Sequence, residues 1–166
     1  MTTLDFTPTQ VNLKLYAGDD VTIRIFLSTD APSSGTFMGT WVSSTAYTAG
    51  QIVEHSLAFY VAILGSTNVT PGSDATKWRA LTPLDLTGYT GWAAQIRSSD
   101  TDAIDFTVDD GDQASSIISI SVTRADLTSI QALGAQAWDL QATDGSGDFR
   151  TFFAGSVTIL ADATRP

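Results

Sequence analysis

Short runs of alternating apolar and polar residues, separated by turn residues, constrain the fold of this chain most. Residues 21–27 read Val-Thr-Ile-Arg-Ile-Phe-Leu, and their odd positions are apolar. Successive side chains of a strand point to opposite faces, so this period predicts half-buried strands with the odd positions inward. The same alternation recurs at residues 11–15, 92–97, 118–122 and 137–143.

Further signals complete an all-β pattern. Residues 105–108 and 149–160 read as strands, and Gly155 inside the longer one predicts a bulge. The Asp-Gly-Ser-Gly-Asp run at 144–148 predicts a hairpin turn between two strands. A short helix is expected over residues 124–133, where apolar residues recur at every third position. About seven short strands with regular turns predict an immunoglobulin-like antiparallel β-sandwich.

The segment between residues 37 and 82 differs from its surroundings. It is rich in large aromatic residues and short on alternating runs, with strands expected only at 51–55 and 58–63. The alternating pattern resumes after Pro83. We therefore expect a discontinuous β-sandwich host domain formed by residues 1–36 and 83–166, with residues 37–82 as a small β domain inserted at a loop.

Composition excludes several classes of partner and site. The chain has 166 residues, with 18 acidic and 8 basic side chains and a formal net charge of -10. Such a surface repels phosphate backbones and anionic membranes, so no nucleic-acid or membrane partner is expected. Cysteine is absent, which removes disulfides and thiolate metal sites. No secretory signal or membrane-length apolar run is visible, so any exit from a cell would need another route, such as lysis or assembly into a particle.

Few residues have the spacing that catalysis or metal binding requires. His55 is the only histidine, and we interpret it as a surface or turn residue. The acidic turns at 109–112 and 144–148 offer carboxylates, but the second has Phe149 and Gly155 where a calcium loop needs its glycine and glutamate. Calcium binding at either turn stays an open alternative. We expect no catalytic residues, cofactor or resident metal, and therefore not an enzyme.

Several phrases of the host domain occur in a familiar order. These are Leu84-Asp85-Leu86-Thr87-Gly88-Tyr89, Ala94-Gln95-Ile96-Arg97, Trp138-Asp139-Leu140-Gln141, Gly155-Ser156-Val157-Thr158-Ile159 and Thr164-Arg165. Together they resemble small tail-associated virion proteins of bacteriophages, in particular the N-terminal domain of upper baseplate proteins of siphophages. The resemblance implies a β-sandwich that docks onto the virion core.

The inserted segment has a resemblance of its own. Its quoted residues are Trp41, Ala46 to Val53, Phe59-Tyr60-Val61-Ala62, Pro71-Gly72 and Trp78-Arg79. In order and spacing they are similar to the small chitin-binding module of bacterial chitinases, a carbohydrate-binding module of family 5/12. The family places adjacent exposed aromatics after the second strand, where this chain reads Ala62-Ile63-Leu64-Gly65. The resemblance implies candidate glycan or partner contacts at Tyr47, Phe59, Tyr60 and Trp78.

These observations lead to one expected function and two alternatives. The expected function is a bacteriophage virion structural protein at the tail, baseplate or fibre attachment, present in many copies. Its partners would be other virion proteins and copies of itself, and its location would be the virion, after assembly in the host cytoplasm. The first alternative is a capsid decoration or head-fibre protein with the same fold. The second is an adhesin whose inserted module binds a glycan on the host surface.

Overall fold

A computed structural model describes residues 9–10, 12–32, 35–98, 103–131 and 136–161 of the chain. Its regular structure is dominated by strands, and the expected all-β class is confirmed. The chain divides into two compact units, Met1–Ile25 with Asp85–Pro166 and Phe26–Leu84. They are called here the sandwich and the module. The module begins at Phe26 and ends at Leu84, so it is wider than the segment 37–82 expected from the sequence.

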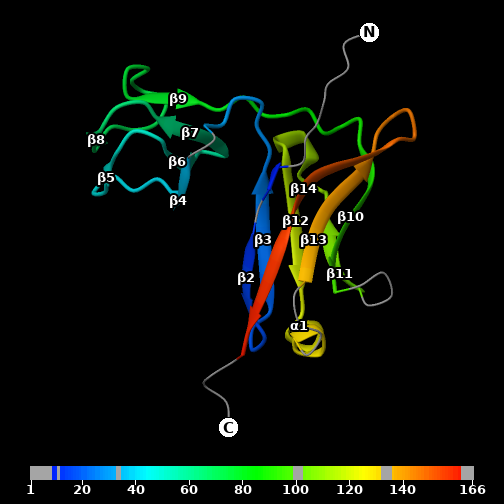
Figure 1. Cartoon of the computed structure of the whole chain (residues 1–166). Helices are drawn as coiled ribbons and strands as arrows, with labels where there is room; N and C mark the ends of the chain where they lie inside the picture. The colour runs from blue at the N-terminus through cyan, green and yellow to red at the C-terminus, as the bar shows by residue number, and fades with distance from the viewer. Residues whose placement is uncertain (1–8, 11, 33–34, 99–102, 132–135, 162–166) are drawn as a thin grey trace. The chain divides into compact units, whose positions relative to one another are not determined.

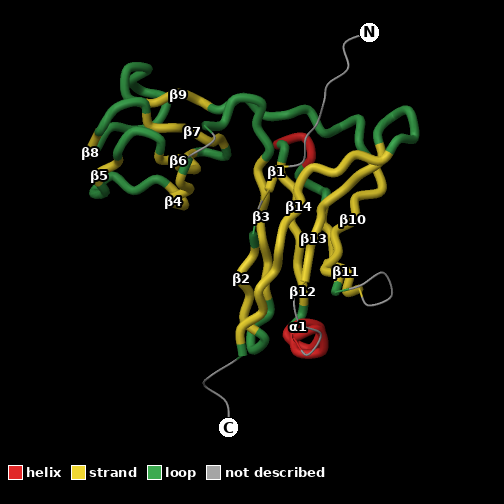
Figure 2. The backbone as a smooth tube through the Cα atoms, viewed as in Figure 1, coloured by secondary structure: helices red, strands yellow, loops and turns green. Residues whose placement is uncertain are grey.

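The sandwich contains eight strands and two short helices among its described residues. The strands are β1 (Thr9–Gln10), β2 (Leu13–Tyr16), β3 (Val21–Phe26), β10 (Thr90–Arg97), β11 (Ala103–Asp109), β12 (Ile117–Val122), β13 (Gln136–Thr143) and β14 (Phe149–Leu160). The helices are the 3₁₀ turn η1 (Gln113–Ser115) and α1 (Arg124–Gln131). Figure 1 labels β2, β3, β10 to β14 and α1, and Figure 2 labels β1 and shows the strands in yellow.

The pairing order of the strands is that of an immunoglobulin-like sandwich. One layer runs β14-β13-β10 and the other runs β3-β12-β11, which reproduces the two sheets of that fold. Strand β11 belongs to both layers, because its residues 103–106 pair with β10 and its residues 107–109 pair with β12. Strands β1 and β2 add to β14 in the parallel direction. The interior therefore lies between two layers that β11 joins into one continuous sheet.

The sandwich core contains the residues that the alternation predicts. Ile96 and Leu140 are fully buried, and Trp138 is 3% exposed. Trp92 was expected inside as well, and it is half-buried, with its ring centroid 4.9 Å from that of Phe152. The apolar positions of β10 and β13 thus face the interior, as the period of two requires.

The bulge in β14 lies three residues from the expected position. Gly155 pairs in register with Trp138, so the glycine is not the bulged residue. The register shifts instead between Phe153 and Thr151, which leaves Phe152 as the extra residue. Phe152 is buried against Tyr89 and Trp92. The prediction at Gly155 was wrong because the bulge serves to turn an aromatic side chain inward.

The expected helix and hairpin turn are both present. Helix α1 begins at Arg124, after Thr123, whose hydroxyl accepts a hydrogen bond from the Asp126 backbone N–H at 3.2 Å. The expected end at residue 133 lies outside the described residues. The hairpin turn at 144–148 joins β13 to β14, and Gly147 supplies the positive φ of 86° that the turn requires.

The described residues of the module form six short strands. They are β4 (Thr36–Thr40), β5 (Ala46–Tyr47), β6 (Gln51–His55), β7 (Ala58–Ala62), β8 (Ser66–Thr67) and β9 (Trp78–Ala80). Four of them form a sheet in the order β4-β6-β7-β9, and β5 pairs with β8. The strands expected at 51–55 and 58–63 are thus present, and the second ends at Ala62. In the described part of the chain, no helix is long and apolar enough to cross a bilayer.

Candidate functional site

One face of the module sheet carries a compact aromatic core. Tyr47 and Trp78 are 3% and 2% exposed, and their rings meet edge to face with centroids 5.3 Å apart. The Trp78 indole Nε1 donates to the Val69 carbonyl at 2.8 Å, and the Tyr47 hydroxyl accepts from the Val42 N–H at 2.8 Å. Both polar groups are therefore used inside the module, and neither ring is available for stacking on a sugar.

Tyr60 lies on the same face and is half-buried against this core. Its ring packs beside Gly72, where an added Cβ would meet the Tyr60 hydroxyl at 3.3 Å. Gly72 also has a positive φ of 85°, so a larger residue would be strained there for two reasons. Tyr60 thus stabilises the loop that follows β8, which is a scaffold role.

Phe59 points to the opposite face of the sheet, because neighbouring residues of a strand alternate. It is 7% exposed, and Phe26 stacks on it with ring centroids 4.0 Å apart. The Phe37 ring is tilted against that of Phe59, with centroids 6.0 Å apart. Phe26 belongs to the module because its ring covers Phe59, which explains why the unit begins before residue 37.

Of the four candidate contact residues, Tyr47, Phe59 and Trp78 are buried, and Tyr60 is half-buried. The structure brings Tyr47, Tyr60 and Trp78 together in one core and places Phe59 in another. A stacking platform for a sugar needs exposed ring faces, so these residues support the module rather than a glycan site.

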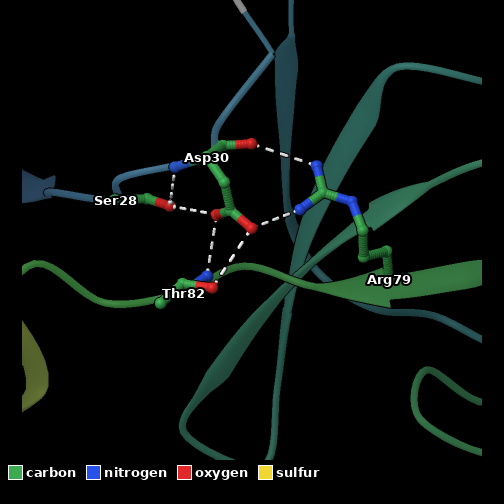
Figure 3. A network of polar contacts seen from close by, with 4 residues as sticks. All are labelled: Ser28, Asp30, Arg79 and Thr82. Carbon is green, nitrogen blue, oxygen red and sulfur yellow. Dashed lines mark hydrogen bonds and ion pairs between the residues drawn. The ribbon is translucent and has the colours of Figure 1, made fainter.

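Asp30 ties the chain that enters the module to the chain that leaves it (Figure 3). Its carboxylate accepts hydrogen bonds from the Ser28 hydroxyl at 2.7 Å and the Thr82 backbone N–H at 2.8 Å, and it pairs with the Arg79 guanidinium. Arg79 also donates to the Asp30 backbone carbonyl at 3.0 Å. We call these residues the clasp: Ser28, Asp30, Arg79 and Thr82.

The clasp holds Asp30 in its charged form. Burial alone would raise the pKa of the Asp30 carboxyl. The hydrogen bonds from Thr82 and Ser28 and the charge of Arg79 outweigh this effect, and the pKa lies below its ordinary value. Each of these partners belongs to the module. The clasp therefore stabilises the module by joining the beginning of its chain segment to the end.

The outward face of the first sandwich layer carries a row of polar side chains. Gln95 donates to Asp105 on β11 and accepts from the Arg97 Nε at 2.9 Å. Arg97 in turn pairs with Asp139 on β13 at 3.4 Å. Beside this row, Ala137, Ala154 and Gly155 leave a shallow depression of about 190 Å³. One Asp139 carboxylate oxygen, Oδ1, is buried there, and none of the described residues donates a hydrogen bond to it.

The remaining sequence candidates have local partners. His55 ends β6 and meets Trp41 edge to face, with ring centroids 5.3 Å apart. The Asp144 carboxylate accepts from the backbone N–H groups of Asp148 and Ser146 and from Arg150, and these bonds lower its pKa. Within the described residues, no group of three His, Cys, Asp or Glu side chains could hold a metal ion.

The surface that sequence reasoning missed is the outer edge of β4. Phe37 is 57% exposed and Met38 is 43% exposed, although both are large and apolar. No strand was expected here, because Gly35 and Gly39 interrupt the pattern of alternation. The signal that could have found it is the absence of charge, since no charged residue occurs between Asp30 and Glu54.

A scan against protein-family models gives no match to this chain, and a search of curated proteins gives none either.

Proposed function

We propose that the protein is a structural component of a bacteriophage particle, at the tail, baseplate or fibre attachment. It would act by assembling with other virion proteins and with copies of itself. The proposed role is assembly and not catalysis, because the observations that support the proposal concern the fold and its surfaces.

The observation that carries the proposal is the position in the fold of the sequence phrases that resemble phage virion proteins. Residues 94–97, 138–141 and 155–159 fall on β10, β13 and β14, which are hydrogen-bonded neighbours in one layer. The phrase at 85–89 forms the turn before β10, in which the Asp85 carboxylate accepts from the Thr87 N–H at 3.0 Å. Phrases that are distant in sequence therefore belong to one continuous structural unit, as expected if they come from one related domain.

The same phrases supply both faces of that layer. Ile96, Trp138 and Leu140 fill the interior, whereas Arg97 and Asp139 lie on the outward face. The resemblance thus includes surface residues that no core constraint explains. An outward face with a paired arginine and aspartate is suited to docking against another protein, where such groups fix orientation.

The module supports an assembly role better than an adhesive one. The residues that resemble a carbohydrate-binding module are scaffold residues, and Tyr47 and Trp78 are buried in the core of the module. The position where that family exposes aromatic rings holds Ile63 and Leu64, which are 43% and 51% exposed. Aliphatic side chains offer no ring face for stacking on a sugar, whereas exposed apolar groups are typical of surfaces that contact another protein.

Sedimentation of phage particles tests the proposal. Particles from cells that encode the chain would be separated on a density gradient and probed with antibodies to the purified protein. We expect the protein to sediment with intact, infectious particles after a high-salt wash. Recovery of the protein only in the unassembled fraction would contradict the proposal.

A further inference from the structure

Charge is distributed unequally between the two units. The module has three acidic and two basic residues, a net charge of -1, whereas the sandwich has fifteen acidic and six basic residues, a net charge of -9. Repulsion between two copies of the chain therefore comes almost entirely from their sandwiches. The module offers the surface where copies meet with the least repulsion.

The module also carries most of the exposed apolar side chains. Among the described residues, eight large apolar side chains are exposed, and six of them belong to the module: Phe37, Met38, Val42, Leu57, Ile63 and Leu64. Phe37 and Met38 are consecutive in β4, so they project from opposite faces of the module sheet. A strand added beside β4 would find an apolar contact on each of its faces.

The edge strand β4 has no charged side chain, in contrast to the other edge strands of comparable length. Proteins protect sheet edges from pairing with other chains by placing charged residues, above all lysine, on them. Strand β2 carries Lys14, β3 carries Arg24, and β9 carries Arg79. Strand β4 ends the order of its sheet, pairs only with β6 within the described part of the chain, and has no charged residue.

We propose that β4 pairs along this free edge with β4 of a second copy of the chain, a surface that rests on the multi-copy assembly proposed above. A two-fold axis makes the two strands antiparallel and the contact self-complementary. The Thr36 N–H bonds to the Gly50 carbonyl on the β6 side, so the backbone groups of Phe37 face the free edge, and Phe37 of one copy pairs with Phe37 of the other. The two-fold axis keeps each residue on its own face, so one face of the joined sheets receives both Phe37 rings and the other receives both Met38 side chains, each opposite Thr36.

The local backbone sets the length of this pairing. The register with β6 shifts between Phe37 and Thr40, and Gly39 has a positive φ of 83°. The regular part of β4 is therefore Thr36–Met38, and pairing with the second copy extends over this stretch. So short an uncharged contact produces a weak, concentration-dependent dimer in the isolated protein, as suits a component that assembles only at high local concentration.

Sedimentation velocity of the full chain over a range of concentrations tests this proposal. We expect a dimer that strengthens when NaCl rises from about 50 to about 500 mM, because salt screens the sandwiches. Phe37→Lys and, separately, Met38→Lys place a charge on the edge and weaken dimerisation at least tenfold. Phe149→Lys is the matched control, since Phe149 is 75% exposed on the sandwich, and it leaves dimerisation within twofold.

Three results would overturn the proposal. The first is a wild-type protein that stays monomeric at every concentration of protein and salt. The second is an F37K or M38K protein that dimerises as wild type while its circular dichroism is unchanged. The third is an F149K protein that loses dimerisation to the extent expected for F37K and M38K. Incorporation into particles is a separate measurement. Wild-type protein that dimerises through β4 yet is absent from particles would contradict the proposed function alone.

Discussion

Asp30 and Arg79 pair across the 49 positions that separate them, and through this pair the beginning and the end of the module hold each other. The pair does not act alone, because Thr82 and Ser28 also donate to the Asp30 carboxylate. A small unit with little core depends on such closure, since its ends would otherwise fray.

Removal of the Asp30 carboxylate should therefore destabilise the module. We expect Asp30→Ala to lower the free energy of unfolding by about 1–2 kcal/mol, the lower part of the range for hydrogen bonds to charged groups because the site is partly exposed. Urea unfolding followed by tryptophan fluorescence measures the change. Asp19→Ala, an exposed acidic residue in a sandwich turn, is the control and should be neutral within about 0.5 kcal/mol.

Stability should fall in acid for the same reason. Hydrogen bonds lower the pKa values of Asp30, Asp74, Asp85 and Asp144 in the folded chain, and a basic neighbour adds to this effect at all of them except Asp85. A carboxyl with a lowered folded pKa stabilises the fold above its unfolded pKa of about 3.9, and this contribution is lost as the pH falls through the folded pKa. Urea midpoints should be level between about pH 5 and 7 and decline below about pH 4.

The decline should be smaller in Asp30→Asn than in wild type, because one of the responsible groups no longer titrates. Equal slopes in the two proteins below pH 4 would show that Asp30 has no part in the acid sensitivity.

The sandwich should fold without the module. The Leu27 carbonyl accepts from the Leu84 N–H at 3.0 Å, and Ser28 bridges to Pro83, so the chain returns to the point where it left. Replacement of residues 29–82 by Asn-Gly closes this gap with a two-residue turn. We expect the shortened protein to keep the near-ultraviolet circular dichroism signal of Trp92 and Trp138 and to unfold in one cooperative thermal transition. A shortened chain without a cooperative transition would mean that the two units fold only together.

The burial of the module's aromatic rings predicts weak sugar binding. Titration with chito-oligosaccharides should give no dissociation constant tighter than about 1 mM, which corresponds to about 4 kcal/mol. Micromolar binding that Tyr60→Ala abolishes, while the module remains folded, would favour the adhesin instead.

The sandwich was largely predictable because its strands are half-buried. Ile96, Trp138 and Leu140 alternate with polar residues, and that period alone assigns them to the interior. The position of the bulge in β14 was not predictable from this period. Gly155 carries the usual sequence signal, whereas Phe152 bulges to reach Tyr89 and Trp92, a tertiary contact that no local pattern contains.

The surfaces of the module were harder to predict. Tyr47 and Trp78 are amphipathic residues that suit either a core or a binding face, and only the structure shows that both are buried. The extent of the module depends on Phe26 reaching Phe59 and on Asp30 reaching Arg79. Contacts between residues so far apart in sequence leave no periodic signal, so the boundary expected at residue 37 was too late.

A cryo-electron microscopy reconstruction of the phage particle would show whether the protein is a structural component of it. We expect density for the immunoglobulin-like sandwich at symmetry-related positions of the tail, baseplate or fibre attachment, in contact with other virion proteins. A particle whose density is fully explained by other chains, with this protein found only free in the lysate, would contradict it.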